Sequence, residues 1–220
     1  MPIFKTKDED FFKKWSHEMA YVLGFISADG NINIGKRGNK YLEITSTDRD
    51  ILEKILISFK ADHKISARKR KEKWKTAFRI QIGSKIIVDD LKNLGITPKK
   101  TFRFKLPEMP TLYFSSFTRG YFDGDGNVWQ GLTHKERRTP TLALRTVFTS
   151  GNEKFLKILA KKLYENKDIK GFIDYHSRAY RLTYSTRSSL SLYKFMYNNA
   201  TIYLNRKKVV FERYINAGVV

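Results

Sequence analysis

A short segment of this sequence occurs twice. Residues 22–32 read VLGFISADGNI and residues 118–128 read TRGYFDGDGNV, an offset of 96 residues that aligns Asp29 with Asp125. Self-similarity at a fixed spacing indicates a repeated structural unit. The sequence therefore predicts two copies of one fold.

The similarity continues downstream of both segments. EITSTDRDILEKIL (43–56) resembles VFTSGNEKFLKIL (147–159), and FRIQIGS (78–84) resembles YRLTYST (180–186). The last two segments alternate apolar and polar residues with the two-residue period of a half-buried strand. Each unit is therefore predicted to run helix, two strands, helix, two strands, helix, which is an α+β order.

Approximate element positions follow from these patterns. In the first unit we expect helices near 14–28, 48–61 and 84–94 and strands near 31–35, 40–46, 64–72 and 76–83. The second unit follows the same plan, with a longer basic connection, GLTHKERRTP, between its first two strands. The prolines and basic residues of ITPKKTFRFKLPEMP suit an extended linker. The predicted division is an N-terminal half at 1–96, a linker at 97–110 and a C-terminal half at 111–220.

Glycine stands inside both repeated helices. Gly24 and Gly120 each cost their helix about 1 kcal/mol relative to alanine. A further small residue, Ala28 or Gly124, follows four residues later. Two such stripes in register allow two helix backbones to approach closely. We therefore expect these helices to pack side by side about a pseudo-two-fold axis.

Each repeated helix is expected to end beside a carboxylate. Gly30 and Gly126 are interpreted as left-handed C-cap residues. Asp29 and Asp125 would then lie near the negative ends of two helix dipoles and near each other. A divalent cation would offset this repulsion, because Mg²⁺ prefers carboxylate, water and phosphate oxygens. A single Asp-Gly pair at a helix end is most simply a turn, but two symmetric copies favour metal binding for phosphodiester chemistry.

The charge of the chain points to a polyanionic partner. Its 220 residues include 43 Lys and Arg against 22 Asp and Glu, a formal net charge of +21. Such an excess is self-repelling without a polyanion, and nucleic acid is the expected one. A membrane surface is the competing partner, but no stretch approaches the length of about 18 apolar residues that a membrane span needs. Cysteine is absent, which excludes disulfides and thiolate zinc sites, and the four histidines lack paired-ligand spacing.

The opening residues, MPIFKTKDEDFFKKW, lack the apolar h-region of a signal peptide. We therefore expect an intracellular protein that is not secreted and that works in the cytoplasm or nucleoid or in an organelle matrix. We also expect a monomer without an obligate protein partner.

The segments VLGFISADG and TRGYFDGDG resemble the two motifs of a LAGLIDADG homing endonuclease in its single-chain, two-repeat form. The repeat order and size extend this resemblance over nearly the whole chain. The family's fold implies a pseudo-two-fold pair of αββαββα units whose motif helices form the interface between the halves. Its two four-stranded antiparallel sheets would form a saddle along the major groove of double-stranded DNA.

The resemblance also implies a metal site. The last acid of each motif is the metal ligand and catalytic acid, which corresponds to Asp29 and Asp125, and the carbonyl groups of Ala28 and Gly124 would complete the site. The expected cofactor is Mg²⁺, with Mn²⁺ or Ca²⁺ as substitutes in crystals. Asp123 has Ser27 at the equivalent place in the first motif, so we interpret it as a polar residue at a helix end and not as a catalyst.

A lysine is expected near the end of each unit, close to the scissile phosphates or the nucleophilic water. LGITPKKT points to Lys100, with Lys99 as its neighbour, and YLNRKK points to Lys207 or Lys208. A role as solvated, phosphate-contacting lysines is the alternative. Many family members carry a glutamine or another polar group at the end of the second strand. Here Ser46 and Ser150 occupy that region, which leaves a water-positioning role open.

Base recognition is expected on the exposed faces of the strands, in the major groove. The apolar members of FRIQIGS and YRLTYST should face the helices, so that Arg79, Gln81, Arg181 and Thr183 face DNA. Each could equally belong to a solvated strand face. The expected neighbouring DNA-binding residues are Asn33, Arg37, Arg68, Arg70 and Arg145.

The predicted function is that of a metal-dependent, site-specific endonuclease, as in intron homing. It would hydrolyse both strands across the minor groove of a long asymmetric DNA target. The alternative is a protein of the same fold that does not cut, either an RNA-splicing maturase or a DNA-binding regulator.

Overall fold

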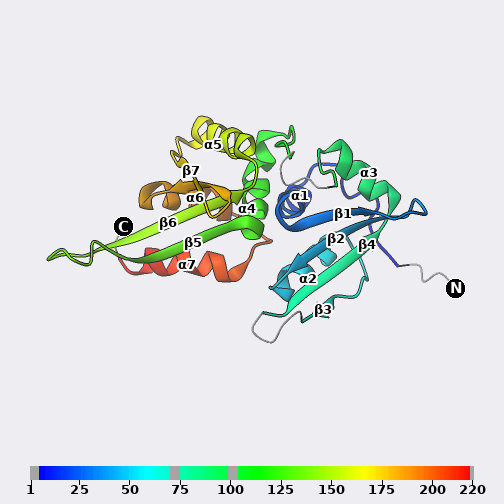
Figure 1. The fold of residues 1–220 in the computed structure, drawn as a ribbon, viewed down its shortest axis with the longest axis horizontal. Helices are drawn as coiled ribbons and strands as arrows, with labels where there is room; N and C mark the ends of the chain where they lie inside the picture. The colour runs from blue at the N-terminus through cyan, green and yellow to red at the C-terminus, as the bar shows by residue number, and fades with distance from the viewer. Residues whose placement is uncertain (1–4, 70–74, 99–103, 219–220) are drawn as a thin grey trace. The chain divides into compact units, whose positions relative to one another are not determined.

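The computed structural model describes residues 5–69, 75–98 and 104–218 and contains two four-stranded antiparallel sheets (Figure 1). The first sheet has the strand order β1-β2-β4-β3, and the second repeats it as β5-β6-β8-β7. The predicted α+β class, the two sheets and the duplicated αββαββα order are confirmed.

The elements of the first repeat are α1 (His17–Asp29), β1 (Gly30–Ile34), β2 (Lys40–Ser46), α2 (Arg49–Ser58), β3 (Ser66–Arg68), β4 (Ala77–Gly83) and α3 (Lys85–Asn93). Those of the second are a 3-10 turn (Thr111–Tyr113), α4 (Phe114–Asp125), β5 (Gly126–Thr133), β6 (Thr141–Ser150), α5 (Glu153–Lys167), β7 (Phe172–His176), β8 (Ala179–Tyr184), α6 (Thr186–Tyr197) and α7 (Asn205–Asn216). The last helix lies beyond the predicted order. No helix in the described ranges combines the length and the apolarity needed to cross a bilayer.

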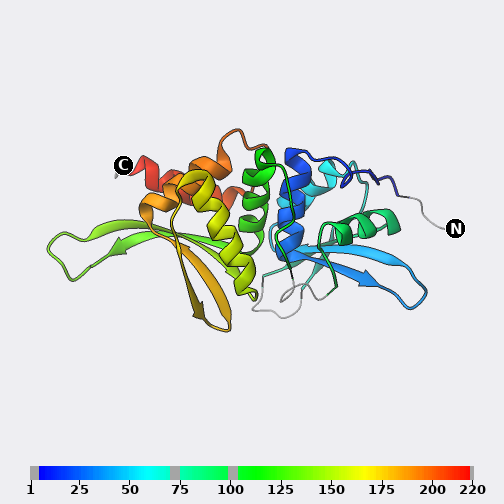
Figure 2. The ribbon, with the colours of Figure 1, turned by 90° about the horizontal axis from the view of Figure 1, so that it is seen from above.

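Apolar side chains on one face of each sheet meet the helices. In β2 and β4, Leu42, Ile44, Ile80 and Ile82 are fully buried and alternate with more exposed residues. In each unit the helices cover one face of the sheet, and no described helix covers the opposite face (Figure 2). The period of two in these strands therefore separates an apolar core face from an accessible polar face.

Residue contacts divide the chain into two compact units. The first comprises Met1–Lys100 and Pro107–Gly124, and the second comprises Thr101–Leu106 and Asp125–Val220. The predicted halves, 1–96 and 111–220, follow the sequence repeat. The compact units follow packing instead, because α4 as far as Gly124 packs against α1.

Two glycines bring the backbones of α1 and α4 into contact. A Cβ atom at Gly24 would lie 2.1 Å from the carbonyl oxygen of Phe117, and one at Gly120 would lie 2.0 Å from that of Tyr21. Each glycine thus faces the backbone of the other helix. The predicted close approach along a stripe of small residues is confirmed, and it explains why the helix-propensity cost of glycine is tolerated twice.

The junctions after the two helices differ from the predicted left-handed caps. Gly30 has φ −86° and ψ 155°, and Gly126 is not among the glycines with positive φ. Both residues already belong to strands, where Gly30 pairs with Ile44 and Gly126 with Phe148. Gly30 is required for space, because a Cβ atom there would lie 2.6 Å from Cγ2 of Ile26. The chain therefore passes from helix to strand without a turn.

Helix α7 packs against β5 in the second unit. Its buried residues, Lys207, Phe211 and Tyr214, recur at the spacing of one helical face. A lysine at a buried position interrupts the apolar pattern of residues 205–216, and this explains why the pattern does not predict the helix.

His63 is a buried titratable side chain in the first unit. It is 9% exposed, and its Nδ1 atom has no hydrogen-bond partner among the described residues. Burial lowers the pKa of His63 from its ordinary value of 6.5, and the positive charges of Lys5 and Lys7 lower it further against the opposing charge of Asp62. The folded chain therefore keeps this imidazole neutral where the unfolded chain would protonate it.

Gly24→Ala and Gly120→Ala are each expected to lower the free energy of unfolding by about 1–3 kcal/mol, the usual cost of overpacking, despite a gain in helix propensity. The added methyl group would meet a backbone carbonyl, which cannot move without separating the helices. Urea denaturation followed by circular dichroism measures the change. Gly83→Ala is the matched control, because its Cβ would meet only the ring of Tyr41 at 3.4 Å. An unchanged or increased stability of the helix variants would contradict the backbone contact.

The wild-type chain is expected to lose more stability than His63→Gln when the pH falls from about 7.5 to about 5. Because the folded-state pKa lies below the unfolded value, the unfolded chain binds a proton that the folded chain does not, and stability falls through this range. Unfolding free energies of both proteins at the two pH values test this expectation. An identical pH dependence would show that His63 does not contribute to it.

Candidate functional site

Asp29 and Asp125 occupy equivalent junctions. Each is the last residue of its helix and is exposed, although the residues two positions earlier, Ser27 and Asp123, are buried. The next residue in each case is the first residue of a strand. Each carboxylate is thus held between a packed helix and a hydrogen-bonded ladder, at the end of the helix where carbonyl oxygens point outward.

Small residues also line the last turns of α1 and α4. A Cβ atom at Gly124 would lie 2.3 Å from Cβ of Ala28 and 3.6 Å from Oδ2 of Asp29. The last turn of α4 in the first unit therefore lies against the last turn of α1. Asp125 follows Gly124 in the chain as the first residue of the second compact unit.

A buried lysine lies beside the second junction. Lys207, in the first turn of α7, is 4% exposed and donates a hydrogen bond from Nζ to the carbonyl oxygen of Gly126 at 2.6 Å. Lys208 instead forms an ion pair with Glu212 at 3.3 Å, and its ammonium lies 4.5 Å from the ring centre of Tyr203. Of the two lysines predicted here, Lys207 is the one that contacts the residue after Asp125.

The predicted lysine of the first unit, Lys100, and its neighbour Lys99 lie outside the described residues. The two serines at the ends of β2 and β6 lie within them. The hydroxyl of Ser46 accepts a hydrogen bond from the backbone of Asp48, and that of Ser150 accepts one from the backbone of Asn152, each at 3.1 Å. Both serines thus form the same turn before the next helix.

Asp123 belongs to a buried polar cluster between α1 and α4. Tyr21 donates a hydrogen bond from its hydroxyl to Oδ2 of Asp123 at 2.8 Å, and the guanidinium of Arg119 lies 5.3 Å from the centre of the Tyr21 ring. In the first motif, Ser27 instead bonds back to the carbonyl of Leu23 at 2.7 Å. Asp123 therefore links the two helices. Its pairing with a tyrosine 102 residues away has no local sequence signal.

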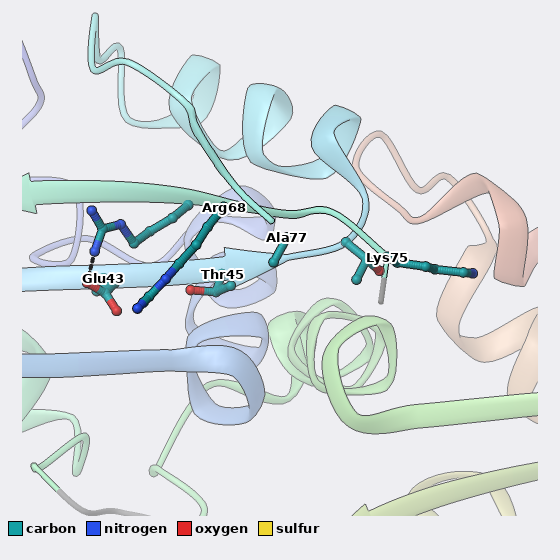
Figure 3. A pocket seen from close by; sticks show the side chains of 7 residues that line it. Glu43, Thr45, Arg68, Lys75 and Ala77 are labelled. Carbon is teal, nitrogen blue, oxygen red and sulfur yellow. Dashed lines mark hydrogen bonds and ion pairs between the residues drawn. The ribbon is translucent and has the colours of Figure 1, made fainter. Parts of the chain in front are cut away.

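The accessible face of the first sheet carries most of the predicted base-reading residues of this unit. Arg79 and Gln81 lie on β4, and Arg79 forms an ion pair with Glu43 of β2 at 3.3 Å (Figure 3). A hollow of about 350 Å³ opens here, lined by Glu43, Thr45, Thr47, Arg68, Lys75, Ala77 and Arg79. Arg68 and Glu43 thus share one hollow, although only the arginine was among the predicted residues.

The other predicted residues of the first unit lie on or near the β1–β2 hairpin. Asn33 is half-buried and its Oδ1 accepts a hydrogen bond from Asn31 at 3.0 Å, whereas Arg37 is exposed in the turn. Arg70 lies outside the described residues.

Within the described ranges, the predicted base-reading arginines of the second sheet differ in whether they are free of an ion pair or held by one. Arg145 is exposed and lies opposite Trp129 in the β5–β6 ladder. Arg181, the repeat equivalent of Arg79, is paired with Asp174 on β7, and this hydrogen bond holds the pKa of the Asp174 carboxyl below its ordinary value. The two equivalent arginines are therefore held by carboxylates from different neighbouring strands.

Thr183 does not present the accessible surface expected of it. It is only 6% exposed, although it alternates correctly with the core residues Leu182 and Tyr184. Its register neighbours on the two flanking strands are Val147 and Phe172, and side chains directly opposite each other share one face of the sheet. Both neighbours are larger than threonine, so Thr183 is flanked on this face by bulkier side chains from two strands.

The donor set fits a hard cation. Each junction offers one exposed carboxylate and the carbonyl group before it, from Ala28 and Asp29 or from Gly124 and Asp125. The described residues contain no cluster of three or more His, Cys, Asp or Glu side chains suited to a metal. Mg²⁺ commonly binds through one or two carboxylates and completes its shell with water and phosphate oxygens. Such an ion is compatible with these junctions.

Comparisons with known proteins agree with this geometry. Residues 16–95 match the family described as LAGLIDADG-like domain. The fold resembles that of the LAGLIDADG meganuclease I-AabMI bound to uncleaved DNA, with 16% identity, coverage of 90% of this chain and 88% of that chain, and a TM-score of 0.62. It also resembles that of the homing endonuclease I-WcaI bound to its DNA recognition sequence, with 17% identity, 92% and 91% coverage, and a TM-score of 0.62. No curated protein sequence matches the chain.

The LAGLIDADG homing endonuclease I-LtrWI, bound to target DNA, is similar in fold over 91% of both chains, at 14% identity and a TM-score of 0.62. The family match covers the first repeat, and the second repeat has the same strand order and a motif helix that packs on the first. Residues 16–95 therefore contain a LAGLIDADG-like domain, and the whole chain has the fold of these LAGLIDADG endonucleases.

Proposed function

We propose that this chain is a site-specific endonuclease that hydrolyses both strands of double-stranded DNA with a divalent metal ion. The observation that carries the proposal is the pair of helix-to-strand junctions, each ending in an exposed aspartate, on helices packed through reciprocal glycines. A purely structural duplication would not need an exposed carboxylate at both places, where the helix dipole disfavours negative charge.

The charge and the accessible sheet faces favour DNA as the substrate. A net charge of +21 favours a polyanion, and lysine and arginine contacts to phosphates supply affinity without sequence information. Sequence is read by side chains that reach base edges in the major groove, where arginine pairs with guanine and glutamine with adenine. Arg79, Gln81 and Arg145 have the required chemistry and strand position.

Two arginines of the sheets, Arg79 and Arg181, are held in place by carboxylates before DNA binds. Glu43 holds Arg79, and Asp174 holds Arg181. Holding a guanidinium fork in one orientation lowers the conformational entropy that is lost when it contacts a base. The negative charges of the same two carboxylates repel phosphate groups. Base-specific contacts of the two arginines are therefore favoured over non-specific contacts with the DNA backbone.

In the proposed reaction, Asp29 and Asp125 would each supply a carboxylate ligand for Mg²⁺, and the carbonyl groups of Ala28 and Gly124 would supply further oxygen ligands. A bound divalent ion supplies Lewis acidity and lowers the pKa of a coordinated water. Lys207 places a positive charge beside the second junction, where it would stabilise the negative charge that develops on the scissile phosphate across the minor groove. Its burial keeps this charge at a fixed position.

Asp29→Asn and Asp125→Asn are each expected to abolish double-strand cleavage and to leave DNA affinity within a few-fold of wild type, because asparagine keeps the shape of the side chain and loses its charge. Cleavage of a target selected from a random duplex pool, assayed with Mg²⁺, and binding to the same target are the two measurements. Glu165→Gln is the control, because it removes an exposed carboxylate from α5, a helix that packs on the core side of its sheet. It should retain cleavage.

Full cleavage by either aspartate variant would remove that residue from the catalytic site. Binding without cleavage by the wild type would favour the maturase or regulator alternative.

Lys207→Ala is expected to slow cleavage at least about tenfold, a loss of about 1.4 kcal/mol of transition-state stabilisation, whereas Lys208→Ala should stay within about twofold of wild type. The difference follows from the contact of Lys207 with Gly126 and the pairing of Lys208 with Glu212. Single-turnover cleavage rates at saturating DNA and Mg²⁺ measure it, and thermal melting shows whether each variant remains folded. Equal rates for two folded variants would assign no catalytic role to Lys207.

A further inference from the structure

The first hairpins of the two sheets differ in length. The β1–β2 ladder contains five residue pairs, from Gly30↔Ile44 to Ile34↔Lys40. The β5–β6 ladder contains eight pairs, from Gly126↔Phe148 to Thr133↔Thr141. Because Gly30 and Gly126 are repeat equivalents, both ladders begin at the same place, and the second continues for three pairs more. Three residues at about 3.3 Å each lengthen the hairpin by about 10 Å.

The longer hairpin is supported by an element that has no equivalent among the described residues of the first repeat. Helix α7 packs against β5, and the hydroxyl of Tyr214 donates a hydrogen bond to the carbonyl of Leu142 at 3.4 Å. Leu142 belongs to the additional pairs. The hairpin extends beyond the helices of its own unit (Figure 2). Leu132 at this level is 49% exposed, so the final pairs lie outside the core.

The additional pairs carry a surface suited to close approach. On the accessible face, which alternates with the buried positions of Leu144 and Val128, they present only small side chains: Gly131, Thr133, Thr141 and Ala143. A Cβ atom at Gly131 would lie 2.4 Å from the Trp129 ring, so that this indole lies along the strand over the glycine. Threonine and alanine contact the thymine methyl group, and threonine also hydrogen-bonds base edges.

The turn at the end of the hairpin is basic and exposed. Lys135, Arg137 and Arg138 are exposed, and within the described part of the chain none of them has an ion-pair partner, whereas Glu136 lies 3.5 Å from His134. Three cations without acidic partners would be available for phosphates. In the first unit, the shorter turn presents Lys36 and Arg37.

We propose that the β5–β6 hairpin makes the DNA target unequal: the half contacted by the second unit is longer by about three base pairs than the half contacted by the first. This rests on the proposed function of DNA binding. An extension of about 10 Å corresponds to about three base pairs at 3.4 Å per step. The small residues of the additional pairs would read these outer positions, while Lys135, Arg137 and Arg138 hold the phosphates beyond them.

The test is a variant in which both 131–133 and 141–143 are deleted, so that the two hairpins match in length. Hydroxyl-radical footprints of the trimmed and wild-type proteins are compared on a duplex selected with the wild type. The trimmed protein is expected to lose protection of about three base pairs at one end only. It should no longer discriminate bases at those positions.

A second variant keeps the backbone intact and guards against misfolding of the trimmed protein. Lys135→Ala/Arg137→Ala/Arg138→Ala should shorten protection at the same end and lower the slope of log affinity against log salt by roughly 2 to 3. Lys36→Ala/Arg37→Ala is the matched control, which should act at the opposite end.

Wild-type footprints on both variants, or losses at both ends of the target, would overturn the inference while leaving DNA binding intact. A wild-type chain that selects no duplex and shows no salt dependence would instead overturn the proposed function, and the unequal target with it. Binding and shortening without any cleavage would still support the unequal target.

Discussion

The reciprocal contact between the backbones of α1 and α4 is the constraint on which the candidate site depends. With no side chain at Gly24 or Gly120, the two helices meet through carbonyl oxygens and fix their mutual register. That register places the last turns of the two helices together, with Gly124 against Ala28. The buried Tyr21–Asp123 hydrogen bond adds a directional constraint to this apolar contact, since a displaced helix would leave a buried carboxylate without this donor.

The two repeats share one topology but differ in their last helices. The last described helix of the first repeat is α3, whereas the second repeat ends with both α6 and α7. From α7 come the buried lysine at the second junction and the support for the long hairpin. Equivalent arginines are likewise held from opposite sides, by β2 in one sheet and by β7 in the other. A repeated fold therefore does not impose a symmetric binding surface.

Much of the fold follows from the sequence, because the repeat, the strand alternation and the helical glycines are local or periodic signals. The positions of Asp29 and Asp125 at helix ends follow in the same way. The conformation of Gly30 does not, since a glycine after a helix is consistent with either a left-handed cap or a tight contact, and only the position of Ile26 distinguishes them. The burial of Thr183 depends on neighbours from two other strands. The choice between Lys207 and Lys208 depends on the rotation of a helix whose pattern a lysine interrupts.

No residue connects α1 to β1 or α4 to β5. These two junctions therefore cannot change length, whereas the hairpin turns can. An insertion at either junction would shift a helix out of its glycine contact or a strand out of register, which moves every side chain to the other face. A hairpin turn can gain or lose residues without either effect. On the proposed function, such a scaffold would gain new DNA sequence preferences by exchange of its turns, while the two aspartates at the helix-to-strand junctions keep their places in the chain.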